Sequence, residues 1–312
     1  MRTRIPPHES PRRGASRLLV LAIAGIALAG CHPGNVEARR LRQSCESGVV
    51  ADCNQFAVKL QKGEYVLRDD ARAATLFERA CTGGVGDGCA SLGVVYQRGS
   101  GVKRDSARAP ALFQQACERG TMDGCTRLGV LVRQGAGVTR DAARAAALFQ
   151  KACDGRDLRG CANLGTVYSL GEGVGQDLAR ATDLFQRSCE EKVALGCVGL
   201  GRHHAAGLGV PRNDSLAAEL FMQACDSGDA GGCFHRGTLY EAGLGVTQKF
   251  DSAAALYRES CDEGLGEACA RLAGLYDRGA GVRRNPERAT EVRKRACDLG
   301  YSDACEKPKK EA

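Results

Sequence analysis

Cysteine pairs eight positions apart are the residues of this chain best suited to chemistry. In LFQQACERGTMDGC, Cys117 and Cys125 flank a short glycine-containing segment, and the pair recurs every 36 residues without an insertion. Such a pair could hold a metal, act catalytically or form a disulfide. No histidine recurs with the pairs and zinc prefers four ligands, so we expect no metal site. The pairs are Cys45 and Cys53, Cys81 and Cys89, Cys117 and Cys125, Cys153 and Cys161, Cys189 and Cys197, Cys225 and Cys233, Cys261 and Cys269, and Cys297 and Cys305.

An internal period of 36 residues is typical of a solenoid. Each unit contains an Ala-rich amphipathic run such as SARAPALFQQAC, which predicts one helix (helix B), and a run such as CASLGVVYQRG, which predicts the other (helix A). We expect Leu112 and Phe113, with Leu148 and Phe149 in the next unit, to fill the core. Gly93 should let a neighbouring helix approach helix A closely.

A turn with a constant glycine and a constant valine follows helix A in each unit. The glycine permits the positive φ that ends a helix, and the valine can cover the adjoining apolar ends. An N-cap candidate for helix B comes next. The glycines are Gly63, Gly99, Gly135, Gly171, Gly207, Gly243 and Gly279; the valines are Val66, Val102, Val138, Val174, Val210, Val246 and Val282; the N-caps are Asp69, Asp105, Asp141, Asp177, Asn213 and Asn285.

Geometry requires a turn between the cysteines of a pair. A continuous helix would hold the Cα atoms of Cys117 and Cys125 about 12 Å apart, too far for a disulfide, so we expect Gly120 and Gly124 to turn the chain. Helix B should then end at the first cysteine and helix A begin at the second. Pairing within each eight-position pair uses all sixteen cysteines, whereas pairing across the longer gap would strand Cys45 and Cys305. Each closed ring would contribute about 2.5 kcal/mol by loop entropy.

The first 30 residues resemble a secretory signal, with five arginines before the apolar run LLVLAIAGIALAG. The ending LAGC resembles a bacterial lipobox, which implies cleavage before Cys31 and lipidation of its thiol; the alternative is an ordinary signal with a free Cys31. His32 in place of Asp would favour the outer membrane. Export to an oxidising compartment would favour disulfides. We therefore expect a signal at 1–30, a lipidated Cys31 with a short tether at 31–44, a solenoid at 45–305 and a polar tail at 306–312.

The net charge gives no reason to expect nucleic-acid binding. Residues 1–30 hold five basic side chains and one acidic side chain, so their removal lowers the net charge from +7 to +3. We expect no cofactor, a monomer, and contact with the membrane through the lipid anchor alone.

The repeats resemble Sel1-like repeats, which are related to tetratricopeptide repeats. The resemblance rests on the G-x-G-V turn in RGSGV and QGAGV, the A-x-x-LF helix and the G-C-x-x-L-G start, over residues 45 to about 305. A cysteine pair in every unit resembles the secreted cysteine-rich Hcp branch. The resemblance implies an all-α, right-handed αα-superhelix of about seven repeats with eight disulfides, whose A helices line a concave face. It also implies either interaction with a partner or weak β-lactamase or penicillin-binding activity.

No arrangement in the repeats marks a catalytic site, and the catalytic residues of any hydrolase remain unknown. Serine β-lactamases carry S-x-x-K with S-D-N and K-T-G. Ser100 and Lys103 form the one S-x-x-K, in a turn where other units place Ala136, Glu172 or Leu208, and neither companion motif occurs.

Four polar residues depart from the repeat pattern and are the candidate binding residues: His203, His204, His235 and Arg236. His203 and His204 replace a valine and a tyrosine of helix A, and Arg236 replaces a leucine. Since stacked helices lie about 10 Å apart, the four could form one patch that binds a carboxylate. The alternative is repeat drift at exposed positions, with Phe234 taking over the apolar role.

Two functions from different classes remain. The first is an exported, lipid-anchored scaffold in the bacterial envelope, facing the periplasm, that binds an envelope protein or a peptidoglycan peptide on its concave face. The second, implied by the resemblance alone, is a weak β-lactamase.

Overall fold

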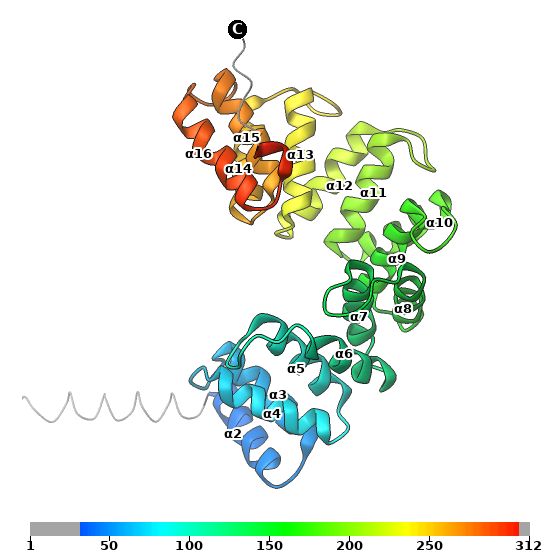
Figure 1. Ribbon diagram of the computed structural model, residues 1–312, viewed down its shortest axis with the longest axis vertical. Helices are drawn as coiled ribbons and strands as arrows, with labels where there is room; N and C mark the ends of the chain where they lie inside the picture. Colours follow the sequence, from blue (N-terminus) through cyan, green and yellow to red (C-terminus); the bar gives the residue numbers. More distant parts are fainter. Residues whose placement is uncertain (1–31, 306–312) are drawn as a thin grey trace, which may run out of the picture. The chain divides into compact units, whose positions relative to one another are not determined.

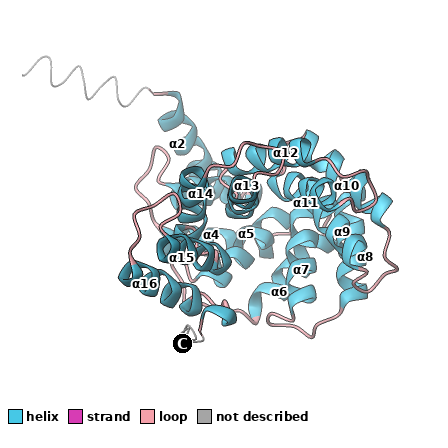
Figure 2. Cartoon of the chain, turned by 90° about the horizontal axis from the view of Figure 1, so that it is seen from above, coloured by secondary structure: helices cyan, strands magenta, loops and turns pink. Residues whose placement is uncertain are grey.

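The computed structural model describes residues 32–305, and all regular elements in this range are helices (Figures 1 and 2). The predicted signal, Cys31 and the tail at 306–312 lie outside the described residues. The B helices are α2 (Pro33–Glu46), α4 (Asp70–Thr82), α6 (Arg108–Glu118), α8 (Ala142–Asp154), α10 (Leu178–Glu190), α12 (Asp214–Asp226), α14 (Phe250–Asp262) and α16 (Pro286–Asp298). The A helices are α3 (Val50–Lys62), α5 (Gly86–Arg98), α7 (Met122–Gln134), α9 (Leu158–Leu170), α11 (Ala194–Ala206), α13 (Ala230–Ala242) and α15 (Gly266–Arg278), and a 3-10 turn, η1 (Ser302–Ala304), follows α16.

The chain forms two compact units, one up to Leu112 and one from Phe113, with the boundary inside α6. In the first unit, α3 packs on α2 and α4, and α4 packs on α5. In the second unit, each helix from α7 to α16 packs on the next. The predicted all-α solenoid of helix-turn-helix repeats is confirmed.

The N-terminal segment differs from the predicted tether at 31–44. Residues 33–46 form α2, a B helix that packs on α3. Pro33 occupies its first turn, and the imidazole of His32 caps it by accepting the Gly34 N–H at 3.2 Å. Between residues 32 and 305, no helix has the length and apolar character needed to span a bilayer.

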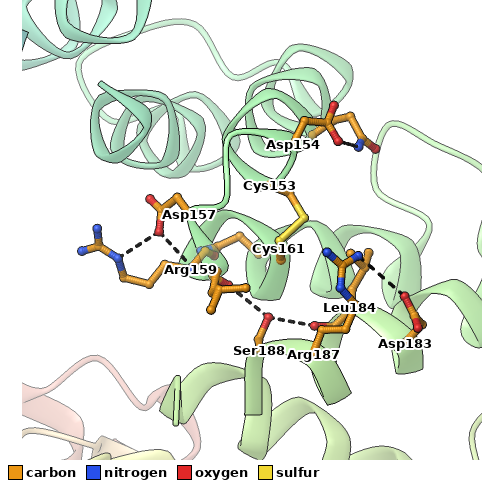
Figure 3. The surroundings of a disulfide bond; sticks show 12 residues. Cys153, Asp154, Asp157, Arg159, Cys161, Asp183, Leu184, Arg187 and Ser188 are labelled. Carbon is orange, nitrogen blue, oxygen red and sulfur yellow. Dashed lines mark hydrogen bonds and ion pairs between the residues drawn. A yellow bond between two sulfur atoms is a disulfide. The ribbon is translucent and has the colours of Figure 1, made fainter. Parts of the chain in front are cut away.

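All eight predicted disulfides are present, with Cα–Cα distances between 4.5 and 4.9 Å. Figure 3 shows Cys153 near the end of α8 bonded to Cys161 in the first turn of α9, with only residues 155–157 between the helices. Helix B therefore runs one residue past the first cysteine, and helix A begins three residues before the second. The bond closes the hairpin as predicted, although the helix boundaries differ slightly.

The two glycines assigned to the Cys117–Cys125 turn have different roles. Gly120 has φ +85° and turns the chain, as predicted. Gly124 instead lies inside α7, where a Cβ would stand 2.6 Å from the Cβ of Ala116 and 3.0 Å from the backbone nitrogen of Cys117. Gly124 therefore permits the close contact of α7 with the end of α6.

The predicted helix ends are largely confirmed. The constant glycine after each A helix is left-handed, as at Gly171 with φ +70°. Asp177 caps α10 by accepting the Arg180 N–H at 2.9 Å. Asp105 accepts the N–H groups of Ala107 and Arg108, and α6 begins only at Arg108. The same side-chain cap occurs at Asp69, Asp141, Asn213 and Asn285.

In α8, α10, α12 and α14 an aromatic ring of the B helix packs against a glycine of an A helix. Phe149 is fully buried, and a Cβ on Gly129 would lie 2.6 Å from its ring. Two later repeats modify this contact. In α14, Tyr257 stands in place of the phenylalanine, and its hydroxyl donates a hydrogen bond to Glu241 at 2.7 Å. In α16, Arg293 stands at the same position and pairs with Asp277.

Replacing Gly124 by Ala should destabilise the protein by about 1–3 kcal/mol, because the new methyl group meets backbone atoms that cannot move aside. The higher helix propensity of alanine would offset part of this loss. Urea unfolding of the disulfide-bonded protein would measure the change. Gly175→Ala is the matched control: a Cβ there has no neighbour within 4 Å, so stability should stay within about 0.5 kcal/mol. Equal stability of the two variants would contradict the proposed contact.

Candidate functional site

The A helices of the second unit come together on one side. Neighbouring A helices contact each other in the pairs α7–α9, α9–α11 and α11–α13. Figure 2 shows α7, α9 and α11 on the inner side of this unit, with α8, α10 and α12 outside. We call the exposed surface of α7, α9, α11 and α13 the A-helix face. Direct packing of A helix on A helix makes it a continuous surface across several repeats.

His203 lies in α11 and is only 2% exposed, so it is part of the core and not of the surface. Its Nδ1 lies 2.7 Å from Oγ1 of Thr182 in α10, and its Nε2 lies 2.8 Å from Oγ of Ser169 in α9. Phe185 packs edge-on against the imidazole, with ring centroids 5.2 Å apart. Three successive helices therefore enclose one imidazole and satisfy both of its nitrogens.

The hydrogen bonds of Thr182 determine the tautomer of His203. The Thr182 hydroxyl donates to the Leu178 carbonyl at 2.8 Å, so its oxygen is left to accept the Nδ1–H of His203. Nε2 then carries the lone pair and accepts the Ser169 hydroxyl proton. Burial, with smaller contributions from Arg202 and His204, lowers the pKa of His203 and keeps the ring neutral near pH 7.

The other three candidate residues do not join His203 in one exposed patch, which differs from the prediction. His204 is half-buried, and its Nδ1 lies 3.4 Å from the Pro211 carbonyl oxygen. The ring of His235 stacks on Phe221, with centroids 5.0 Å apart. The Arg236 guanidinium lies over the Tyr240 ring at 5.6 Å. Neither form of the prediction, binding patch or exposed drift, anticipated that His203 is buried.

His235 is held neutral by its surroundings. Burial, followed by the positive charge of Arg202, lowers the pKa of His235 to about 4, and Asp229 only partly offsets this. The ring therefore carries no charge near neutral pH, and it contributes to the A-helix face mainly through its stacked, half-buried surface.

Arg202 is the important residue that the sequence analysis missed. It is exposed on α11 and lines a cavity of about 110 Å³ together with Ser169 and His203. Its position holds Val94, Val130, Thr166, Thr238 or Gly274 in other repeats, so the charged substitution was visible in the stacked sequence.

Apolar side chains surround this cavity. Leu170, Leu195 and Leu208 line it and are 55%, 38% and 38% exposed. Since large apolar side chains gathered at a surface hollow often mark a binding site, the cavity is the candidate functional site of the second unit.

A larger cavity of about 860 Å³ lies in the first unit, between α2, α3 and the segment leading into α4. Three of the four arginines that line it have carboxylate partners: Arg68 pairs with Asp70 at 2.7 Å, and Arg42 and Arg72 both approach Glu46. This surface is therefore internally charge-compensated, and we do not assign it a ligand.

Two other sequence features can now be placed. Ser100 and Lys103 lie in the turn after α5, where the Ser100 N–H donates to the Val95 carbonyl at 3.2 Å. Cys225, Cys233 and Glu259 bring possible metal ligands within 4.8 Å of one another. However, the two sulfur atoms are bonded to each other at 2.04 Å, so they offer no thiolates to a metal.

The repeats of this chain match a known protein family. A family model described as Sel1 repeat matches residues 60–85, 86–121, 123–157, 158–193, 194–229, 230–265 and 266–301. No curated protein matches the sequence.

Solved structures show the same kind of fold. A protective antigen of uropathogenic Escherichia coli with an SLR fold is 29% identical, with a TM-score of 0.60 over 86% of this chain and 57% of the antigen. The chain thus spans little more than half of that antigen. A Sel1 repeat protein from Oxalobacter formigenes is 24% identical, with a TM-score of 0.59 over 86% of this chain and 78% of that one. The Helicobacter pylori cysteine rich protein B is 28% identical over 42% of this chain and 93% of its own, with a TM-score of 0.35.

His235 should make the protein less stable in mild acid. The unfolded chain takes up a proton at a pKa near 6.5, whereas the folded ring does so only near 4, so stability should fall as the pH drops from about 6.5 to 4. In His235→Gln, the loss of stability over this pH window should be smaller by roughly 1–3 kcal/mol. Urea unfolding at pH 7 and pH 4.5 would measure it. A loss equal to that of the unmodified protein would show that His235 titrates normally in the folded state.

Proposed function

Because the chain belongs to the Sel1 repeat family, we propose that it is a binding scaffold that takes an extended peptide segment of an envelope protein on the A-helix face of its second unit. Sel1 repeats generally serve protein–protein interaction. The regular positions of each repeat account for folding: glycine turns, N-caps, apolar rings and disulfides. A binding function must therefore use side chains at which the repeats differ from one another.

The observation that carries this proposal is the cavity between α9 and α11. It combines three exposed leucines with the positive charge of Arg202. It lies between α9 and α11, two A helices that pack directly on each other. Exposed apolar side chains favour an apolar residue of the partner, and Arg202 favours an adjacent carboxylate. A peptide with a leucine-like side chain next to Asp or Glu meets both requirements. A peptidoglycan peptide, which also carries carboxylates, is the alternative partner.

The proposed location of the scaffold is the outer membrane of a bacterial envelope, facing the periplasm. The charge and apolar run of residues 1–30, the lipobox-like LAGC and His32 support export and lipidation at Cys31. Disulfides in every repeat support an oxidising compartment. Since α2 begins at Pro33, a lipid on Cys31 would hold the first helix close to the bilayer.

The alternative function implied by the Hcp resemblance is weak β-lactam hydrolysis. The turn that contains Ser100 and Lys103 does not support it. Ser100 is held at a helix C-terminus by its backbone, in the position where other repeats carry Ala136 or Leu208. The turn therefore has an adequate structural explanation, and we do not assign it a catalytic role.

Replacing Arg202 by Glu should reverse the charge preference of the A-helix face. A displayed library of random peptides, selected on the immobilised disulfide-bonded protein, should yield peptides that place Asp or Glu beside a leucine-like residue. Their affinity should fall about tenfold or more in Arg202→Glu, because a close like-charge contact replaces an attraction.

Arg187→Glu provides the matched control for that selection. Arg187 is an exposed arginine of α10, a B helix, and is 55% exposed. Affinity in this variant should stay within about twofold. Loss of binding in both variants, or in neither, would place the peptide site elsewhere.

Cys31→Ser should abolish incorporation of radiolabelled palmitate and release the protein from the membrane fraction into the soluble periplasm. Cys305→Ser, which alters a disulfide cysteine at the other end of the chain, is the control and should keep the label. Incorporation that persists in Cys31→Ser would rule out lipidation at that residue.

A further inference from the structure

The cavity beside Arg202 contains a serine and a histidine in the arrangement of a nucleophile and its base. The Oγ of Ser169 lies 2.8 Å from Nε2 of His203, and the tautomer fixed by Thr182 leaves the lone pair of Nε2 directed at the serine hydroxyl. An activated serine requires a neighbouring base, which is in turn oriented by a third group. Thr182 is that third group, because its oxygen accepts the Nδ1–H at 2.7 Å.

Ser169 is reached from solvent through the cavity, and the buried His203 lies behind it. Ser169 and His203 both line the cavity of about 110 Å³, and Ser169 is half-buried at its edge. The remaining walls are largely apolar, with Leu170, Leu195 and Leu208 among them. A small cavity of this kind favours a short acyl group over a bulky one.

Arg202 supplies the electrostatic component. Its side chain lines the same cavity as the serine, so a carbonyl oxygen that becomes negative during attack on a bound substrate would develop near a positive charge. The same cation would attract substrates that carry a carboxylate.

The fold itself does not require these polar groups. The position of His203 holds Val167 and Leu239 in the adjacent repeats, and that of Thr182 holds Ala146 and Ala218. Buried apolar residues suffice there, whereas a buried imidazole is stable only with partners for both nitrogens. Polar replacements in α10 and α11 therefore meet Ser169 of α9, whose position is polar in most other repeats, and the three side chains are matched to each other.

We propose that Ser169 and His203 form an acyl-transfer site that hydrolyses short-chain esters, with Thr182 positioning the imidazole and Arg202 stabilising the oxyanion. This activity goes beyond the binding role and does not depend on it. Ser169 and His203 are the catalytic residues, since both would act on the reacting atoms, and Thr182 is a positioning residue.

The reaction balances with water as the only co-reactant. The Ser169 oxygen attacks the carbonyl carbon while His203 Nε2 takes the hydroxyl proton, giving a tetrahedral intermediate beside Arg202. The carbon–oxygen bond to the alcohol then breaks, and the imidazolium returns the proton to the departing alcohol. Water attacks the acyl-serine with His203 again as base. The carboxylic acid leaves, and the proton returns to Ser169.

The test uses the disulfide-bonded protein with 4-nitrophenyl acetate and with a fluorophosphonate that reacts with activated serines. We expect saturable release of nitrophenol, preceded by a burst equal to one acyl group per chain. Peptide mapping should place the phosphonate on Ser169 of the unmodified protein. Absence of labelling, or labelling at another serine, would overturn the proposal without requiring any variant to fold.

Variants separate catalysis from a structural role. Ser169→Ala should abolish the burst, His203→Gln should slow turnover about 10²- to 10⁴-fold, and Thr182→Val should lower kcat more than it changes KM. Ser260→Ala is the matched control, because this buried helical serine donates to the Leu256 carbonyl and contacts no histidine in the described structure; its turnover should be unchanged. A burst that survives in Ser169→Ala would overturn the assignment.

The pH profile gives a readout that a purely structural histidine would not produce. Because burial lowers the pKa of His203, the base is protonated only at a lower pH than an ordinary histidine. The rate of acylation should therefore stay constant down to a pH below 6.5 before it falls. A fall centred at or above pH 6.5 would exclude buried His203 as the base. Peptide binding should persist in Ser169→Ala, so failure of the binding proposal and failure of this one are distinguishable.

Discussion

The close approach of each B helix to the following A helix is the constraint on which the rest of the structure depends. A disulfide holds the Cα atoms of Cys153 and Cys161 4.5 Å apart, and Gly160 leaves no side chain between the helices. With the hairpin closed at this end, the aromatic ring of α8, α10, α12 or α14 meets a glycine of an A helix, and the apolar core forms between them. A chain with no tryptophan and 5% aromatic residues thereby obtains a well-defined core from small contacts.

Most polar side chains that enter the core between residues 32 and 305 are provided with a hydrogen-bond partner. One position of helix A supplies that partner in three repeats: Ser169 for His203, Glu241 for Tyr257, and Asp277 for Arg293. The Glu241 and Asp277 pairs tie the C-terminal repeats together, and burial together with Glu241 raises the pKa of Tyr257, so its hydroxyl remains a donor. The Ser169 pair differs because it lines a cavity that solvent can enter. The same kind of polar contact therefore lies, at Ser169, where a substrate could reach it.

Binding and acyl transfer would share one surface in this molecule, and Arg202 would take part in both. Arg202 and the leucines around it would recognise charge and apolar shape, whereas the imidazole of His203 is buried behind Ser169. Repeat proteins acquire function at positions that the repeat leaves free, and here those positions lie on α9 and α11, the helices that contact each other on the A-helix face.

The sequence alone determined the helical repeat, the disulfide pairing and the turns, because each rests on local rules repeated at a fixed period. The left-handed conformation at Gly171, the cap at Asp177 and the bond between Cys153 and Cys161 follow from residue type and spacing. Only the tertiary structure decided the site. Stacking of α9, α10 and α11 brings Ser169, Thr182 and His203 together across 34 positions of sequence. A periodic sequence pattern does not show which face of a helix a neighbouring helix covers. The sequence singled out His203 as unusual but placed it in a surface patch; burial by adjacent helices, a long-range property, made it part of a hydrogen-bonded core.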